Sequence, residues 1–307
     1  MAPIRAATAL DVFKLFLLGG IWGSAFLCIA IALEGLPPTS IAAGRIALAG
    51  AALGAVAWGR GARLPRDGKT WALIILIGAL NSAVPFLLIS WGQQAIASSR
   101  AAILMATGPF AVLALSHLFT RDDRLTLPKL AGVVLGFAGV VLLVGFDAVI
   151  GDHASVAGQL AVVGAALCYA VSALLTRKAA HVPPLALSAT VLGSAALYMV
   201  PAALLYDRPW ELAPGWDSLA AVLFLGLFPT GLAYLLRFQI INDVGMTFMS
   251  QVSYLVPIFG VLWGWLFLAE MPTPAAWGAL ALVLAGIAIS RLGPARRIRP
   301  RATGAPV

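Results

Sequence analysis

The chain has 307 residues, of which 61% are hydrophobic and only 10% charged, and its mean hydropathy is +0.97. This composition excludes a water-soluble domain and predicts an integral membrane protein. The net charge of +8 and the basic stretch from Arg296 to Arg301 are compatible with nucleic-acid binding. A basic anchor beside anionic lipid headgroups explains both features, so we expect a lipid bilayer and no nucleic acid as partner.

Ten apolar segments are long enough to cross a bilayer as helices, which takes about 20 residues each. The predicted spans are residues 13–33, 39–58, 71–92, 98–119, 128–145, 156–176, 184–205, 216–237, 246–268 and 274–291. We therefore predict an all-α integral membrane protein of ten transmembrane helices with short loops.

The second half of the chain repeats the first. A shift of 146 residues places Pro183 on Pro37, and a shift of 148 places Pro257 on Pro109. We interpret this as two copies of one unit, followed by a basic cytoplasmic tail. The copies cover residues 11–145 and 156–292, the polar stretch 146–155 joins them, and the tail covers 293–307. Because each copy has five spans, the second enters the membrane from the opposite side, which predicts inverted repeats around a central cavity.

The distribution of basic residues indicates the orientation, since Lys and Arg in short loops stay on the cytoplasmic side. With the N-terminus inside, 17 of the 20 Lys and Arg residues are cytoplasmic, Arg237 among them. Only Arg100 and Arg208 fall outside, and Arg45 lies within a span. We expect both termini to be cytoplasmic.

The first and second spans each hold one unusual residue. Trp22 lies at mid-membrane, whereas the other tryptophans lie near helix ends, where indoles prefer the interface. Its N–H needs a partner at this depth, so Trp22 either packs beside Gly19, Gly23 and Ser24 or faces a cavity. Arg45 lies about seven residues inside the second span, where it anchors the helix or faces water.

Polar side chains in the third and eighth spans indicate an aqueous interior. Asn81, Pro85 and Leu88 recur at helical spacing, so they share a face that we assign to the cavity. Pro109 and Pro257 lie near the midpoints of the fourth and ninth spans, where each removes a backbone hydrogen bond. We predict that they act as a hinge or gate, with ordinary helix packing as the alternative.

Several expected absences limit the chemistry. All 12 acidic residues fall in loops or at helix ends, so we expect no carboxylate relay for protons or sodium and no export of cationic drugs. His117, near the cytoplasmic end of the fourth span, is interfacial or proton-sensing. Cys28 and Cys168 lie in apolar spans, and we expect no disulfide, metal or other cofactor. Without a catalytic motif, an enzyme is not expected.

Several motifs, in their order and duplication, resemble the EamA branch of the drug/metabolite transporter superfamily. They are Trp22-Gly23-Ser24-Ala25-Phe26, Arg45, Ser98-Ser99-Arg100-Ala101-Ala102 before Pro109, and Leu268-Ala269-Glu270. The first copy departs from this pattern, with Asp122-Asp123 in place of Glu270. The resemblance implies an exporter of small metabolites in a bacterial inner membrane. It also implies alternating access through a central cavity lined by helices 1, 3, 4, 6, 8 and 9.

Within this family, the chain resembles the aromatic amino-acid exporters. We expect export of aromatic and other neutral amino acids by facilitated diffusion or exchange, from a monomer or weak homo-oligomer. A flippase for a lipid or polyprenyl-linked carrier is the alternative, and a groove open sideways to lipid would distinguish it. No bidentate charge clamp for the substrate is evident. The residues expected to bind substrate are Trp22, Ser24, Asn81, Pro85, Leu88, Tyr169, Tyr234 and Tyr254.

Overall fold

The computed structural model describes residues 5–119, 126–149 and 152–290. Within these ranges, every regular element is a helix, as predicted. The predicted link 146–155 lies partly outside the described residues. The Asp122-Asp123 pair and the basic tail 293–307 lie wholly outside them.

The first half of the chain forms five helical spans, two of them interrupted. They are α1 (Ala9–Leu33), α2 (Pro38–Gly59), the continuous run α3 (Gly68–Gly78), η1 (Ala79–Ala83) and α4 (Val84–Gly92), the broken pair α5 (Ser98–Met105) and α6 (Gly108–Phe119), and α7 (Leu127–Val149). Loops begin where the apolar run ends, and Pro38 occupies the first turn of α2, where its missing N–H costs no hydrogen bond.

The second half repeats this order. It comprises α8 (His153–Lys178), α9 (Pro184–Tyr206), the short η2 (Pro209–Glu211), the run α10 (Trp216–Leu225), η3 (Gly226–Leu232) and α11 (Ala233–Val244), the pair α12 (Met246–Met249) and α13 (Val252–Leu268), and α14 (Pro274–Ser290). Nine spans of the described chain are long and apolar enough to cross a membrane, and α14 is a shorter apolar helix. The ten predicted spans are thus confirmed.

The interruptions lie at matching places in the two halves. The third and eighth spans each contain a π-helical segment, η1 and η3. The fourth and ninth spans are each broken early, after Met105 and after Met249. Pro109 follows the first break closely, but Pro257 lies inside the continuous α13. The predicted equivalence of the two prolines as hinges is therefore only partial, because the backbone breaks upstream of Pro257.

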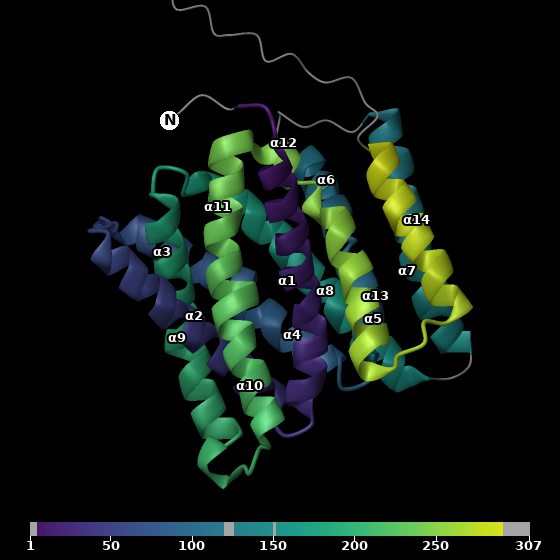
Figure 1. The fold of residues 1–307 in the computed structure, drawn as a ribbon, viewed down its shortest axis with the longest axis horizontal. Helices are drawn as coiled ribbons and strands as arrows, with labels where there is room; N and C mark the ends of the chain where they lie inside the picture. Colours follow the sequence, from purple (N-terminus) through teal and green to yellow (C-terminus); the bar gives the residue numbers. More distant parts are fainter. Residues whose placement is uncertain (1–4, 120–125, 150–151, 291–307) are drawn as a thin grey trace, which may run out of the picture.

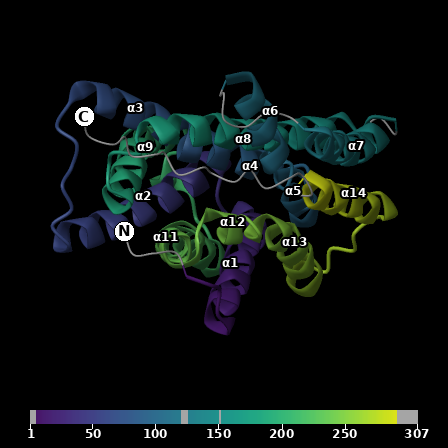
Figure 2. The same cartoon turned by 90° about the horizontal axis from the view of Figure 1, so that it is seen from above.

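The packing between the two halves follows the same symmetry. Helix α2 packs on its counterpart α9, and α7 packs on its counterpart α14. The contact of α1 with α13 is matched by that of α8 with α5 and α6, and the contact of α1 with α11 by that of α8 with α4. Figure 1 shows α1 between α11 and α13, with α7 and α14 together at one edge, and Figure 2 confirms both from above. The two halves thus meet along the centre of the molecule.

Candidate functional site

A central cavity of about 350 Å³ lies where the two halves meet. It is lined by Trp22, Ala25, Phe26 and Ile29 of α1, Arg45 of α2, Asn81 of η1, Phe86 and Ile89 of α4, Met105, Ala106, Gly108 and Pro109 of the fourth span, Tyr169 of α8, Pro229 of η3, Tyr234 and Arg237 of α11, and Val252, Ser253, Val256 and Pro257 of α13. The lining residues come from spans 1, 3, 4, 6, 8 and 9, which were all expected to line the cavity. Span 2, which was not expected there, contributes Arg45.

One face of α1 forms an apolar wall of the cavity. Trp22, Phe26 and Ile29 are spaced four and three residues apart, which places them on one side of a helix. The indole Nε1–H of Trp22 donates to the carbonyl oxygen of Pro229, 3.0 Å away. Trp22 therefore satisfies its polar atom through the second half of the chain while its ring lines the cavity.

Ser24 does not line the cavity, contrary to our expectation. It lies two residues from Trp22, which is roughly 200° around a helix, so its side chain points to the opposite face. There its hydroxyl donates to the carbonyl oxygen of Ile21 at 2.8 Å. Ser24 borders a separate apolar groove formed with Phe259 and Trp263.

The π-helical segment η1 changes which residues of the third span face the cavity. Asn81 lines it as expected, but the next two lining residues are Phe86 and Ile89. Pro85 and Leu88 were expected there and instead pack away from it, Pro85 buried and Leu88 against the apolar core. A π turn takes up one extra residue, so it moves the register of the following helix by one position.

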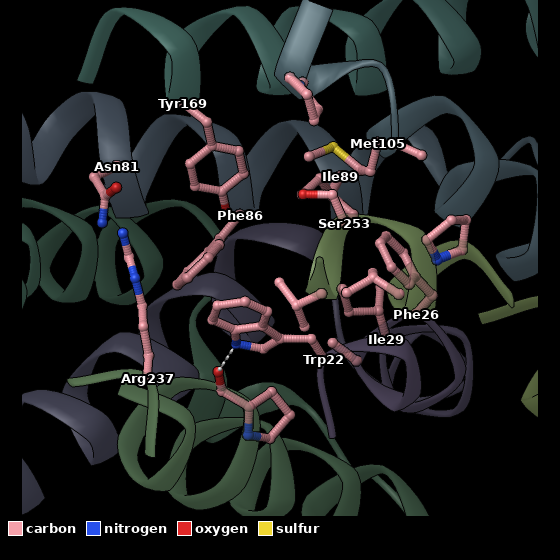
Figure 3. Close-up of a pocket in the computed structure, with 18 of the residues that line it drawn as sticks. Trp22, Phe26, Ile29, Asn81, Phe86, Ile89, Met105, Tyr169, Arg237 and Ser253 are labelled. Atoms are coloured by element: carbon pink, nitrogen blue, oxygen red, sulfur yellow. Dashed lines mark hydrogen bonds between the residues drawn. The ribbon is translucent and has the colours of Figure 1, made fainter. Parts of the chain in front are cut away.

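A hydrogen-bonded polar group occupies one side of the cavity. The Asn81 amide Nδ2 donates to the Tyr234 hydroxyl at 2.8 Å, and the Ser172 hydroxyl donates to the amide oxygen of Asn81 at 3.3 Å. Figure 3 shows Asn81 and Arg237 on this side, Phe26 and Ile29 on the other, and Trp22 between them. The cavity is thus amphipathic, with polar groups and apolar side chains at different sides.

Two arginines also line the cavity, although neither was among the expected binding residues. Arg45 is 7% exposed, and its Nε–H donates to the Thr230 hydroxyl at 2.7 Å. Arg237 was assigned to the cytoplasmic side because the predicted eighth span ended there. In the structure α11 continues to Val244, so Arg237 lies within the helix and lines the cavity. The cavity lining thus includes two guanidinium groups that the sequence analysis did not assign to it.

The remaining expected residues divide into two groups. Tyr169 and Tyr234 line the cavity, as do Pro109 and Pro257. Tyr254 instead packs against the apolar cluster of Ala106, Phe110, Val283 and Ile287. Among the described residues, no group of three His, Cys, Asp or Glu side chains is arranged to hold a metal ion.

Away from the cavity, acidic side chains form hydrogen bonds and ion pairs at helix ends. The Glu270 carboxylate accepts the backbone N–H groups of Ser98 at 2.8 Å and Ser99 at 2.9 Å, at the start of α5. Near the start of α1, Asp11 accepts two hydrogen bonds from Arg5. These two acidic residues therefore serve as a cap and an ion-pair partner at helix ends.

Comparison with known proteins identifies the family. The pattern of the EamA-like transporter family matches the chain twice, over residues 11–145 and 156–292. The chain belongs to the EamA-like transporter family. It is accordingly a multi-pass membrane transporter, which confirms the resemblance seen in its motifs.

Relatives of this EamA-like transporter have similar length. An uncharacterized transporter of Bacillus subtilis, YoaV, is 21% identical over 90% of this chain and 95% of its own. A probable terminal-alkyne amino-acid exporter of Streptantibioticus cattleyicolor is 25% identical over 87% and 88%, respectively. An uncharacterized inner membrane transporter of Escherichia coli, YedA, is 25% identical over 91% and 90%. A crystal structure with a TM-score of 0.66 and 23% identity, covering 93% of this chain and 98% of the other, supports the fold alone.

Proposed function

We propose that this EamA-like transporter exports aromatic and other neutral amino acids from the cell. In this proposal the substrate binds in the central cavity, and the two halves rock around it to open each side of the membrane in turn. Transport runs down the substrate gradient or by exchange.

The amphipathic lining of the cavity carries this proposal. Trp22, Phe26 and Phe86 offer apolar surface to a side chain, while Asn81 and Tyr234 offer hydrogen bonds to polar ends. The volume of about 350 Å³ lies near the lower end of the roughly 300–1,000 Å³ typical of small-molecule pockets. The relative named as a probable terminal-alkyne amino-acid exporter supports the same substrate class.

The lipid flippase remains the second candidate, because an apolar groove lies between α1 and α13. Phe16, Ile21 and Trp263 are among the residues that line it. Ser24 is its only hydroxyl-bearing residue, and this hydroxyl already donates to Ile21. The groove suits an acyl chain but offers nothing to a headgroup, so we favour the central cavity as the substrate site.

Counterflow in proteoliposomes tests the proposed function. Vesicles loaded with unlabelled phenylalanine should transiently accumulate labelled phenylalanine, and unlabelled leucine should compete. Ala25→Trp places a large side chain in the cavity and should abolish counterflow, whereas Ala131→Trp on the exposed surface of α7 should not. Size-exclusion profiles show whether both variants fold. Absence of counterflow for every amino acid, together with movement of labelled lipid between leaflets, would favour the flippase.

The proposed orientation places both termini and the loop between α2 and α3 in the cytoplasm. Thiol labelling tests this in a variant that lacks Cys28 and Cys168. Asp152→Cys, at the exposed start of α8, should react with an impermeant reagent in intact cells. Arg63→Cys should react only after permeabilisation, and the reverse pattern would overturn the orientation.

A further inference from the structure

Two guanidinium groups line the central cavity, one from each half of the chain. Arg45 comes from α2 and is almost completely buried, and Arg237 comes from α11 and is half-buried. No Asp or Glu is among the lining residues that the structure describes. Because guanidinium stays protonated at any physiological pH, the described cavity lining carries two positive charges and no carboxylate.

The Arg45 side chain is held in a fixed position. Its Nε–H donates to the Thr230 hydroxyl, which in turn donates to the carbonyl oxygen of Leu225 at 2.9 Å. Its central carbon lies 3.7 Å from the centre of the Phe86 ring, a cation–π contact. No described residue forms a hydrogen bond with its two terminal nitrogens. The end of the fork is therefore available to a ligand in the cavity.

Neither arginine has an acidic partner within the described chain. The ionisable groups that interact with Arg45 are Tyr169, Tyr234 and Cys28, which are ordinarily neutral at pH 7. Arg237 forms no ion pair or hydrogen bond with a described residue. A charge inside a membrane protein is costly unless it is paired, and such residues commonly mark a substrate pathway.

We propose that Arg45 and Arg237 form an anion site that binds the carboxylate of the substrate and makes its ammonium group dispensable. Guanidinium donors suit a carboxylate, whereas an ammonium group would find only neutral acceptors such as Asn81, Tyr234 and Ser253. The substrate class then widens from amino acids to monocarboxylates with an aromatic or aliphatic body, including 2-oxo and 2-hydroxy acids. This inference rests on the proposed function only in taking the cavity as the substrate site.

Two matched ligands distinguish the contributions of the carboxylate and the ammonium group of an amino acid to binding. 3-Phenylpropanoate keeps the ring and the carboxylate of phenylalanine, and phenethylamine keeps the ring and the ammonium. We expect 3-phenylpropanoate to raise the melting temperature of the purified protein in detergent and to inhibit phenylalanine counterflow. Phenethylamine should do neither at the same concentration. Competition is the suitable readout because both compounds cross bilayers in their neutral forms.

Substitution of each arginine tests the site itself. Arg237→Gln and Arg45→Gln should each weaken binding of 3-phenylpropanoate roughly ten- to hundredfold, as expected for loss of hydrogen bonds to a charged group. Arg237→Lys should retain part of the affinity, because it keeps the charge without the planar fork. Arg60→Gln is the control, since Arg60 is exposed at the end of α2 and outside the cavity. Should Arg45→Gln fail to fold, Arg237→Gln still decides the question.

The outcomes distinguish this inference from the proposed function. Binding of 3-phenylpropanoate that depends on Arg237, without counterflow of phenylalanine, would support the anion site and refute amino-acid export. Equal binding of phenethylamine and 3-phenylpropanoate would overturn the anion site while amino-acid export stands. Unchanged affinity in both the Arg45→Gln and Arg237→Gln proteins would also overturn it.

Discussion

Trp22 performs two tasks at the centre of the protein. Its ring forms part of the apolar wall, and its Nε1–H donates to the carbonyl oxygen of Pro229. That carbonyl belongs to η3, where the π-helical backbone departs from regular α-helical bonding. Trp22 thus joins the first half of the chain to the irregular segment of the second, at the central cavity.

The size of this ring predicts how substitution affects selectivity. Trp22→Ala should reduce counterflow of phenylalanine and tryptophan more than that of alanine, because large apolar substrates lose most contact area. Burial of apolar surface contributes on the order of 25 cal/mol per Å². We therefore expect the counterflow rate of aromatic substrates to fall about tenfold or more. Counterflow rates with labelled phenylalanine, tryptophan and alanine measure this difference in selectivity.

Trp277→Ala is the matched control for this prediction, because Trp277 is 54% exposed on α14. It should leave all rates near those of the native protein. Equal loss for every substrate in the Trp22→Ala protein would assign Trp22 to helix packing alone.

The sequence predicted the neighbourhood of the site better than its individual residues. Depth along a span predicted that Trp22, Asn81, Tyr169 and Tyr234 lie at the level of the central cavity, and all four line it, because depth follows from counting residues. Depth does not define the direction of a side chain around the helix, so Ser24 was placed on the wrong face. A charged residue near a predicted helix end resembles a loop residue, and Arg237 was missed for that reason.

At the scale of elements, Glu270 connects the end of α13 to the start of α5. Ala269 adopts a left-handed conformation, with φ of 52°, which ends α13 and turns the chain so that Glu270 reaches back. Its carboxylate then accepts the N–H groups of Ser98 and Ser99, which have no partner within their own helix. Gly264 leaves the room for this contact, because a Cβ there would lie 2.7 Å from Glu270 Oε2.

This contact predicts a graded loss of stability. Glu270→Gln can retain one of the two hydrogen bonds and should cost about 1 kcal/mol, whereas Glu270→Ala loses both and should cost about 2 kcal/mol. In detergent, the melting temperature should be highest for the native protein, lower for Glu270→Gln and lowest for Glu270→Ala. Glu211→Gln removes a carboxylate from a surface pair with Arg208 and should change the melting temperature little. Identical melting of all four proteins would exclude a stabilising role for Glu270.

The ten spans were predictable because a bilayer requires long apolar segments, and this requirement is visible in composition. The π-helical segments were not, since they depend on the backbone bonding around Pro85 and Pro229 and not on apolar length. The π-helical segment η1 shifts the register of the helix that follows it. As a result, Phe86 and Ile89 line the cavity in place of Pro85 and Leu88. Prolines at comparable places in both halves were the one available signal.

At the scale of the whole molecule, the distribution of charge bears on energy coupling. The titratable groups that line the described cavity are Arg45, Arg237, Tyr169 and Tyr234, and groups of these types do not ordinarily change charge between pH 6 and 8. His117 is exposed in the last turn of α6 and does not line the cavity. We therefore expect transport to depend little on pH in this range and not to be driven by a pH gradient alone.

The membrane potential should act differently on the two substrate types. A zwitterionic amino acid carries no net charge across the membrane, whereas a carboxylate without an ammonium carries one negative charge outward per cycle. An inside-negative potential of 100 mV favours that movement by about 2.3 kcal/mol, roughly a fiftyfold concentration ratio at equilibrium. An exporter that binds anions at Arg45 and Arg237 therefore needs no coupling ion.

Current measurements on protein-containing membranes test this prediction. A concentration jump of 3-phenylpropanoate should produce a sustained current whose sign corresponds to anion movement, and phenylalanine should produce none. Passive entry of the neutral acid carries no charge, so membranes without protein provide the baseline. Arg237→Gln should reduce the anion current in parallel with binding, and Arg60→Gln should preserve it. A sustained current with phenylalanine would instead reveal a co-transported ion and exclude simple facilitated diffusion.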